Sequence, residues 1–406
     1  MPAPTVLLTG LCALIYLFDG LIHSLLGPLA PDMAASLHLG NAQLGPIFSA
    51  NLAGQCLGLV LLPLLADRLS QRGVVLLSLA GFGLAQAATA LADGPASLIA
   101  WRLVTGFFLG GCLPSCLAMV TAAAPVARRG LAIMVLFTGY GLGAALAGLV
   151  ATGFAAHGGW RAAMVAVGGA CLVTLALAWA GLREVPSPAG NDASPSAAGP
   201  RLRTLDILSR RYAIGTLLLW LLFISLLTIS YCLNSWLPTL LVEVGRDKQF
   251  ASLSVTIFSF GGIIAALCVG LLIDRFGTRP TLLGFTAMSA VLLYAIGQVM
   301  ATASESVLML LLAACGFFVL GAYGGVNVVL ATYYPAPLRA TGIGWAKSIG
   351  RVGTLVAPVL IGLALGAGMR GATILSLFAL PALLAVASLL AIRTGERKSL
   401  APSGVS

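Results

Sequence analysis

The sequence predicts an all-α membrane protein in which twelve transmembrane helices form two halves of six. Its composition, a series of long apolar segments and a repeat between the halves support this fold class. Of the 406 residues, 59% are hydrophobic and only 8% are charged, and the mean hydropathy is +1.04. Because a water-soluble domain carries about 25% charged residues, most of this protein's surface must face the hydrocarbon of a lipid bilayer.

Apolar segments of about twenty residues recur along the chain, and this length lets an α-helix cross a hydrocarbon core of about 30 Å. We expect helices at residues 5–31, 42–65, 74–92, 97–123, 130–155, 160–182, 212–240, 250–273, 279–301, 306–333, 340–366 and 372–392. The first segment carries Asp19 and has no basic stretch before it, so we interpret it as a membrane helix and not as a signal peptide.

A polar segment rich in proline, serine and charge separates the sixth expected helix from the seventh. It divides the chain into an N-terminal six-helix bundle at residues 1–182 and a C-terminal six-helix bundle at 212–392. The segment at 183–211 is expected to be a cytoplasmic linker, and residues 393–406 a cytoplasmic tail.

The net charge of +10 reflects membrane topology and not nucleic-acid binding. If both termini are cytoplasmic, the loops on that side hold fifteen lysines and arginines, and the opposite loops hold four, which are Arg161, Arg246, Lys248 and Arg370. Lysine and arginine concentrate in cytoplasmic loops. We therefore expect a multi-pass protein of a bacterial-type inner (plasma) membrane, with its N- and C-termini in the cytoplasm.

Charged residues recur at equivalent loops of the two halves. Asp67 and Arg68 follow the second helix, and Asp274 and Arg275 follow the eighth helix 207 positions later. Arg339 follows the tenth helix. Parallel repeats of this kind place a binding site between the two halves of a transporter. We expect these five residues to gate the cytoplasmic side of such a site.

The repeated loop carries a family resemblance. Twelve helices, a polar middle loop and a G-x-x-x-D-R-x-G-x-R loop in both halves resemble the major facilitator superfamily. The second copy, GLLIDRFGTR from Gly270, matches this pattern fully, whereas the first copy has Pro63 and Ser70 in place of glycines. The resemblance implies the major facilitator fold, a monomer, and rocker-switch alternating access.

Three further segments resemble the aromatic acid:proton symporter family, and most closely its hydroxyphenylpropionate and benzoate transporters. They are WRLVTGFFLGGCLP at 101–114, LNSWLPTLLVEVG at 233–245 and YYPAPLRATGIGWAKSIGRVG at 333–353. This resemblance implies proton-coupled import of a small aromatic or related organic acid. It also implies that Arg102 is buried and pairs with Asp19, although Arg102 could instead extend to the outer interface. The first helix keeps Asp19 but lacks the family's second acid, since Ile22 stands in its place.

Asp19 is the one acid well inside an expected helix, and His23 is the one histidine there. Burying an ionisable group in a membrane costs at least about 2.5 kcal/mol, so both residues are functional candidates. Positions i and i+4 share one helix face. Histidine titrates near neutral pH, and burial favours the uncharged form of an aspartate. We expect this pair to take part in proton coupling, and a fixed polar contact is the structural alternative.

Arg351 lies about eleven residues into the eleventh expected helix, near the middle of the membrane, and no acid of the second half lies at that depth. The planar guanidinium of arginine matches a carboxylate through two hydrogen bonds. We therefore expect Arg351 to bind the carboxylate of the substrate. Lys347, one turn nearer the cytoplasm, either assists Arg351 or extends to the interface.

Uncharged polar and aromatic side chains complete the expected substrate site. Hydrogen bonding between helices is the alternative role for the amides, and an interfacial position is the alternative for the tryptophan. The candidates are Asn51, Gln55, Asn234, Asn327, Tyr323 and Trp236.

The sequence contains no nucleotide-binding loop, no metal-ligand pattern and no nucleophile with a matching base. The eight cysteines lie in apolar segments without a Cys-x-x-Cys pair, so we interpret them as packing residues. An enzyme, a cofactor and a metal site are therefore not expected. An organic-anion exchanger, a drug or metabolite efflux antiporter, and a non-transporting sensor are the alternative functions.

Overall fold

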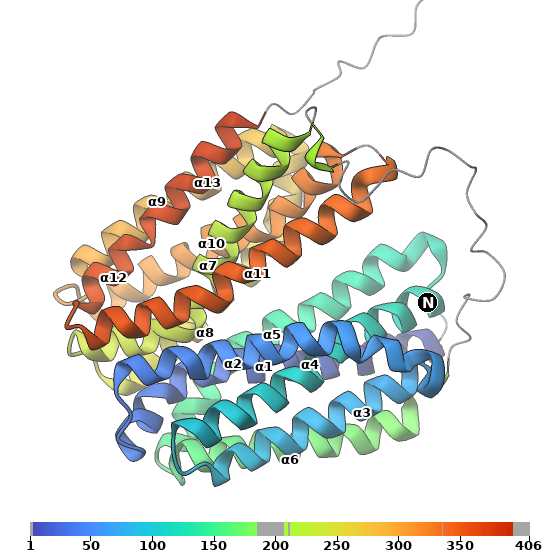
Figure 1. The fold of residues 1–406 in the computed structure, drawn as a ribbon, viewed down its shortest axis with the longest axis horizontal. Coiled ribbons are helices and arrows are strands. Elements are labelled where there is room, and N and C mark those ends of the chain that lie inside the picture. The colour runs from blue at the N-terminus through green and yellow to red at the C-terminus, as the bar shows by residue number, and fades with distance from the viewer. Residues whose placement is uncertain (1–2, 185–206, 210–211, 335, 393–406) are drawn as a thin grey trace, which may run out of the picture.

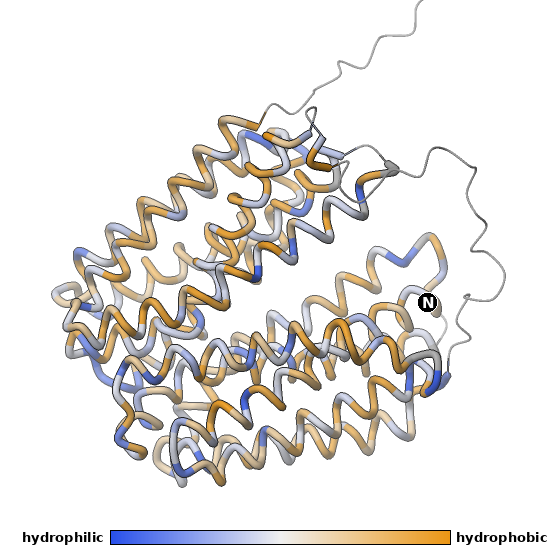
Figure 2. The backbone as a smooth tube through the Cα atoms, in the orientation of Figure 1, coloured by the Kyte–Doolittle hydropathy of each residue, from blue (hydrophilic) through white to orange (hydrophobic). Residues whose placement is uncertain are grey.

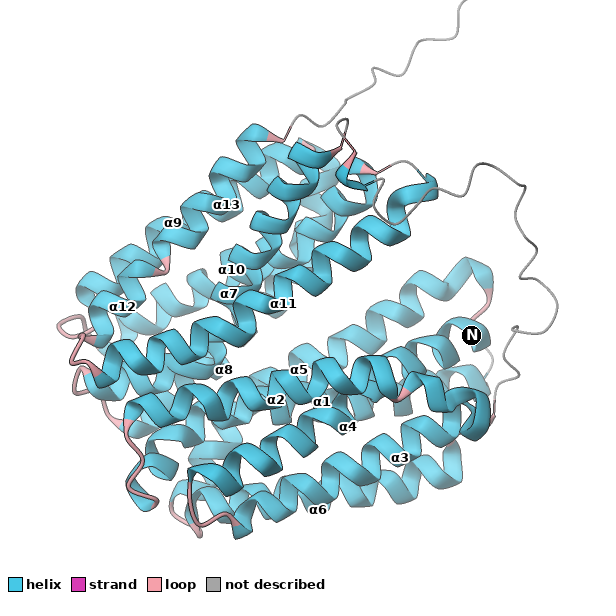
Figure 3. Cartoon of the chain, in the orientation of Figure 1, coloured by secondary structure: helices cyan, strands magenta, loops and turns pink. Residues whose placement is uncertain are grey.

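The computed structural model describes residues 3–184, 207–209, 212–334 and 336–392. Within these residues every regular element is a helix (Figures 1 and 3). Twelve of the described helical segments are long and apolar enough to cross a membrane. Most of the expected linker and all of the expected tail lie outside the described residues.

The N-terminal helices lie together as one group in Figure 1. Their bounds are α1 Ala3–Ser36, α2 Asn41–Leu61, α3 Ala66–Ala88, α4 Pro95–Ala123, α5 Arg129–Ala155 and α6 Gly159–Gly181, with short 3-10 turns at Pro63–Leu65, Thr89–Leu91 and Val126–Arg128. The remaining helices form the second group. They are α7 Ala213–Glu243, α8 Lys248–Phe276, α9 Thr278–Val299, α10 Glu305–Tyr333, α11 Ala336–Gly366, α12 Gly371–Leu377 and α13 Ala379–Ala391.

Three of the membrane crossings differ from the sequence expectation. Helix α1 continues to Ser36 with two prolines inside it, because prolines are tolerated in membrane helices. Helix α3 starts before the expected position 74 and has a kink at Ser70, whose φ is 61°. The last crossing is broken into α12 and α13 at Phe378. Pro381 lacks the N–H that would bond the carbonyl of Leu377, which explains this break.

The helices are mostly hydrophobic along their length, and many of the hydrophilic residues lie at their ends and in the connections between them (Figure 2). Large side chains such as Ile214, Leu271 and Leu310 are more than two-thirds exposed. Exposed apolar patches of this extent are unusual in soluble monomers. These surfaces are therefore suited to contact with lipid.

Glycines allow several helices to pack closely. A Cβ at Gly106 of α4 would overlap the backbone carbonyl of Asn51 in α2, and a Cβ at Gly143 of α5 would overlap that of Leu17 in α1. Small residues let membrane helices approach at the backbone. These contacts fix how α2 and α1 are placed, and these two helices carry most of the candidate residues of the first half.

The internal repeat is visible as the same contact in both halves. Arg72 Nη2 donates a hydrogen bond to the carbonyl of Trp179 at 2.7 Å, and Arg279 Nη2 donates one to the carbonyl of Leu390 at 2.6 Å. Each acceptor lies in the last turn of a helix, where backbone carbonyls lack a helical partner. Both arginines belong to the repeated loops, so the repeat has a structural role in each half.

The two groups of helices meet at one end and diverge towards the other (Figure 1). They meet where α1 ends and α2 begins, which we call the outer end. There the Ser49 hydroxyl donates to the carbonyl of Leu355 at 2.7 Å. The Ser252 hydroxyl donates to the carbonyl of Pro28 at 3.3 Å. Hydrogen bonds between α2 and α11 and between α1 and α8 thus join the halves at this end.

An ion pair also joins the halves at the outer end. Lys248 Nζ lies 2.7 Å from Asp32 Oδ1, and this is the one ion pair among the described side chains. Both side chains are partly exposed to solvent. Exposed ion pairs contribute about 0–1 kcal/mol. The ion pair therefore contributes little to the stability of the contact between the halves.

The residues expected to gate the cytoplasmic side lie at the opposite end. Arg68, Asp274, Arg275 and Arg339 are exposed and form no ion pair with another described side chain. The side chain of Asp67 lies outside the described residues. In this arrangement the polar contacts between the halves are concentrated at the outer end and the middle of the protein.

Replacing Gly106 by valine is expected to force α2 away from α4, because the new side chain would overlap the backbone of α2. Overpacking of this kind costs about 1–3 kcal/mol or more. Gly169→Val on α6 is the matched control, since a Cβ there meets no atom within 4 Å. Thermal unfolding of both purified variants measures the effect. Equal melting temperatures would contradict the predicted close packing.

Candidate functional site

Asp19 and His23 lie on the face of α1 that is turned towards the second half. Their side chains are only 1% and 8% exposed. The His23 ring centroid lies 4.7 Å from that of Tyr231 in α7 and 6.3 Å from that of Tyr140 in α5. The two ionisable residues are therefore buried where helices of both halves meet.

Arg351 of α11 reaches across to α2. Its Nη1 donates a hydrogen bond to Gln55 Oε1 at 3.3 Å and lies 3.8 Å from Cys56 Sγ. It also interacts electrostatically with Asp19 and His23. No carboxylate of the described residues lies within ion-pair distance of Arg351. The structure thus brings together four of the residues expected to bind substrate or proton, and the guanidinium has no acidic partner.

Four tyrosines from four helices surround this group. Tyr16 and Tyr140 have ring centroids 5.2 Å apart, and the side chains of Tyr140 and Tyr231 interact with each other. Tyr231 and Tyr323 interact electrostatically with Arg351. Only Tyr323 was among the residues predicted from sequence. The sequence signal for the other three is that a phenol hydroxyl lies inside an apolar span, where it needs a polar partner.

The expected ion pair between Arg102 and Asp19 is wrong for this structure. Arg102 is 1% exposed, which also excludes the alternative of extension to the interface. Its Nη2 donates to Gln86 Oε1 at 2.9 Å, to Thr105 Oγ1 at 3.2 Å and to the hydroxyl of Thr89. Gln86 of α3, Thr89 of the following 3-10 turn and Thr105 of α4 supply these neutral acceptors, so Arg102 Nη2 has partners that are not carboxylates.

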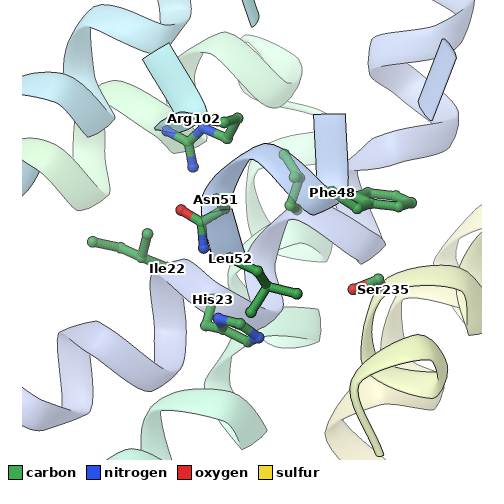
Figure 4. A pocket seen from close by; sticks show the side chains of 8 residues that line it. Ile22, His23, Phe48, Asn51, Leu52, Arg102 and Ser235 are labelled. Atoms are coloured by element: carbon green, nitrogen blue, oxygen red, sulfur yellow. The ribbon is translucent and has the colours of Figure 1, made fainter. Parts of the chain in front are cut away.

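A small cavity links His23 to Arg102, and its size suits roughly one water molecule. Figure 4 shows the side chains of Arg102, Asn51 and His23 around this space. Its lining consists of Ile22, His23, Leu26, Phe48, Asn51, Leu52, Arg102 and Ser235. Arg102 Nε, Asn51 Oδ1 and His23 Nδ1 are all buried without a hydrogen-bond partner. Buried polar atoms are normally paired, so this cluster requires an explanation.

The other amides expected in the substrate site bond within their own helices. Asn234 Nδ2 donates to the carbonyl of Ser230 at 2.9 Å. Asn327 Nδ2 donates to the carbonyls of Tyr323 and Gly324 at 3.3 and 3.2 Å. Both amides thus resemble structural polar groups more closely than Gln55, which bonds across the two halves.

The two remaining candidates lie at the edges of the site. Trp236 is fully buried and packs edge-on against Phe48 of α2, with ring centroids 5.1 Å apart. Lys347 is exposed and interacts electrostatically with Arg351. Within the described residues, no cluster of three or more histidine, cysteine or acidic side chains could hold a metal ion.

Comparison with known proteins identifies the family. Residues 12–245 and 219–405 both match the family described as Major Facilitator Superfamily. The chain belongs to this superfamily. The repeat of two matching regions agrees with the repeated loops and with the paired arginine contacts described above, and the expected fold class is confirmed.

Curated relatives of this major facilitator protein include transporters of aromatic acids. The chain is 32% identical to a gallate transporter of Pseudomonas putida, over 95% of this chain and 91% of that protein. It is 35% identical to a 3-(3-hydroxy-phenyl)propionate transporter of Escherichia coli K12, over 89% of this chain and 88% of that protein. The expected relationship with aromatic acid transporters is therefore confirmed.

Solved structures of the same fold are more distant in sequence. A bacterial homologue of the human lysosomal transporter Spinster, in an inward-facing and unoccupied conformation, has a TM-score of 0.78 at 17% identity, covering 96% of this chain and 98% of that chain. A D-xylose–proton symporter has a TM-score of 0.75 at 17% identity, covering 95% and 96%. At these identities the similarity concerns the fold alone.

The hydrogen bonds of Arg102 predict that two substitutions, Gln86→Leu and Asp19→Asn, reduce the stability of the fold by different amounts. Gln86→Leu removes a buried acceptor from the guanidinium and is expected to destabilise the fold by about 1–3 kcal/mol. Asp19→Asn removes no contact of Arg102 and should have a smaller effect. Thermal unfolding of the two variants distinguishes the cases. A larger loss of stability in Asp19→Asn would indicate that Arg102 pairs with Asp19, as expected from sequence.

Proposed function

We propose that the protein is a proton-coupled symporter that imports a small aromatic acid, and that Arg351 binds the acid's carboxylate. The observation that carries this proposal is the position of Arg351. It bridges the halves to Gln55 but has no carboxylate within ion-pair distance among the described residues. A partly buried guanidinium without a counterion favours an anionic ligand, because a charge in low dielectric is costly unless it is paired.

Two observations support the proposal that the substrate is aromatic. Proteins named as transporters of gallate and of 3-(3-hydroxy-phenyl)propionate are 32% and 35% identical to this chain. Tyr231 and Tyr323 lie close enough to Arg351 to interact with it electrostatically, and tyrosine rings present an apolar face together with a polar hydroxyl. An aromatic acid carries the same two properties, so it matches both the guanidinium and the rings beside it.

Asp19 and His23 are proposed to carry the coupled proton. They are the buried acid and the buried histidine next to the proposed carboxylate site. Protonation there changes the charge that faces Arg351, so proton and substrate binding are linked. Arg102 would take part through the cavity that it shares with His23, and not through an ion pair with Asp19.

The transport cycle is proposed to be rocker-switch alternating access by a monomer in a bacterial inner membrane. With both termini cytoplasmic, the outer end faces the periplasm, and the present contacts at that end belong to an inward-facing state. In the outward-facing state Asp67, Arg68, Asp274, Arg275 and Arg339 would make the cytoplasmic contacts. Asn234, Asn327, Trp236 and Lys347 complete the proposed substrate path.

Replacing Arg351 by alanine is expected to lower the affinity for an aromatic carboxylate by at least about tenfold. Hydrogen bonds to charged groups contribute about 1.5–3 kcal/mol, and 1.4 kcal/mol corresponds to a factor of ten. Isothermal titration of the purified protein with benzoate and 4-hydroxybenzoate measures the change. Arg370→Ala is the control, because it removes an arginine at an exposed position. Unchanged affinity in Arg351→Ala would show that Arg351 does not bind the carboxylate.

Proton coupling is expected to depend on Asp19. Accumulation of a labelled acid in proteoliposomes with an imposed proton gradient should collapse with an uncoupler and should be lost in Asp19→Asn. The exposed Asp93→Asn serves as the control. Uptake that is insensitive to the uncoupler and undiminished in Asp19→Asn would instead indicate an organic-anion exchanger.

A further inference from the structure

We propose that Tyr231 of α7 is the residue that couples the proton to the substrate, because its single O–H can bond either Asp19 or a carboxylate held by Arg351. This assignment rests on the function proposed above, since it takes Asp19 as a proton carrier and Arg351 as the carboxylate anchor. It adds the side chain through which the two sites affect each other.

Tyr231 interacts with both proposed sites. Its ring meets the ring of His23 edge-on, with the centroids 4.7 Å apart. Its side chain interacts electrostatically with Asp19 and with Arg351. Asp19 and Arg351 also interact with each other, but they are not within ion-pair distance. One tyrosine of the second half thus faces the proposed proton carriers of the first half and the proposed anchor at once.

The packing of α1 on α7 places Tyr231 at this point. Gly27 lies one turn after His23, and a Cβ on Gly27 would overlap the backbone carbonyl of Asn234 in α7. The two helix backbones therefore meet directly, about one turn outward of the ring contact between His23 and Tyr231. Small residues let membrane helices approach in this way. The contact of Tyr231 with the first half is thus fixed by the backbones and not only by the side chains.

Asp19 needs a hydrogen-bond donor most when it is ionised. Its Oδ1 is buried without a hydrogen-bond partner among the described residues. An ionised carboxylate only accepts hydrogen bonds, whereas a protonated one carries a donor of its own. A buried charge is costly unless it is paired or hydrogen-bonded. The present contacts therefore suit a protonated Asp19, and loss of its proton would require a donor from a neighbouring hydroxyl.

The hydroxyl of Tyr231 can serve two acceptors in turn. A phenol carries one O–H, so it donates to one acceptor at a time. While Asp19 is ionised, it competes with the substrate's carboxylate for this hydrogen. Once Asp19 is protonated, it can donate to the Tyr231 oxygen instead, and the Tyr231 hydrogen is free for the substrate. Proton binding therefore strengthens substrate binding, and by linkage the substrate promotes proton binding to the same extent.

The other titratable groups around Tyr231 do not replace it in this exchange. Besides Asp19 and Arg351 they are Tyr16 and His23 of α1, Cys56 of α2, Tyr140 of α5 and Tyr323 of α10. Tyr16 and Tyr140 interact with Asp19 and belong to its half. Tyr323 interacts with Arg351 and belongs to that residue's half. Tyr231 interacts with Asp19 across the boundary between the halves.

The test measures the Kd of benzoate on either side of neutral pH. Isothermal titration of the full-length purified protein is expected to show tighter binding at the lower pH in the wild type. Tyr231→Phe keeps the ring against His23 but removes the O–H. It should weaken binding about tenfold at the lower pH and leave the Kd at the higher pH unchanged, because Asp19 already holds the hydrogen there. Equal weakening at both pH values, or no weakening at either, would overturn the assignment.

Two further tyrosines supply matched controls. Tyr323 interacts with Arg351, so Tyr323→Phe is expected to weaken benzoate binding by the same factor at both pH values. Tyr294 is more than half exposed on α9, and Tyr294→Phe should bind benzoate as the wild type does. A loss of pH dependence in Tyr323→Phe as large as that in Tyr231→Phe would contradict a specific role for Tyr231.

The titrations also separate this inference from the proposed function. Asp19→Asn supplies the reference, since any pH dependence that remains in it comes from other groups such as His23 and Lys347. If the wild type loses its pH dependence in Asp19→Asn but keeps it in Tyr231→Phe, the proposed function stands and Tyr231 is not the coupling residue. If benzoate does not bind the wild type, or binds it equally at both pH values, both proposals fail.

Discussion

The absence of water in the hydrocarbon core is the constraint on which the whole structure depends, because every polar group there must find its partner within the protein. Two arginines meet it differently. Arg102 donates to three neutral side chains of α3, α4 and the 3-10 turn between them, and it is held in place by its own half. Arg351 reaches an amide and a thiol of the other half, and no carboxylate of the described residues lies within ion-pair distance of it. The contacts of one arginine thus stay within its own half, and those of the other join the two halves.

The same constraint determined what the sequence could predict. Long apolar segments made the helices recognisable, and the rarity of charge inside them singled out Asp19, His23 and Arg351, which the structure brings near one another. The partner of Arg102 could not be predicted, because it depends on how α3 is rotated against α4. Helices that are apolar all around carry no amphipathic stripe that would fix this rotation.

Three tyrosines near Arg351 and Asp19 were not predicted from the sequence, for a related reason. Tyr16 and Tyr140 meet where α1 packs on α5 within the first half, and Tyr231 of α7 joins them only when both halves are assembled. Along the sequence each one resembles an ordinary apolar residue with a hydroxyl. The cavity at His23 was hidden in the same way, since its polar atoms come from α1, α2 and α4. Sites between helices are properties of the tertiary packing.

The closure of the outer end has an energetic consequence. Its polar contacts are two hydroxyl–carbonyl hydrogen bonds and one partly exposed ion pair. A typical hydrogen bond contributes about 0.5–1.5 kcal/mol and an exposed ion pair about 0–1 kcal/mol, so these three contacts are only part of what joins the halves. Glycines also let the helix backbones meet there. A Cβ at Gly45 of α2 would overlap the carbonyl of Pro358 in α11, and a Cβ at Gly148 of α5 would overlap that of Ser252 in α8. The closure therefore depends on direct backbone packing as well as on polar contacts, and a side chain added at either glycine would wedge the two halves apart.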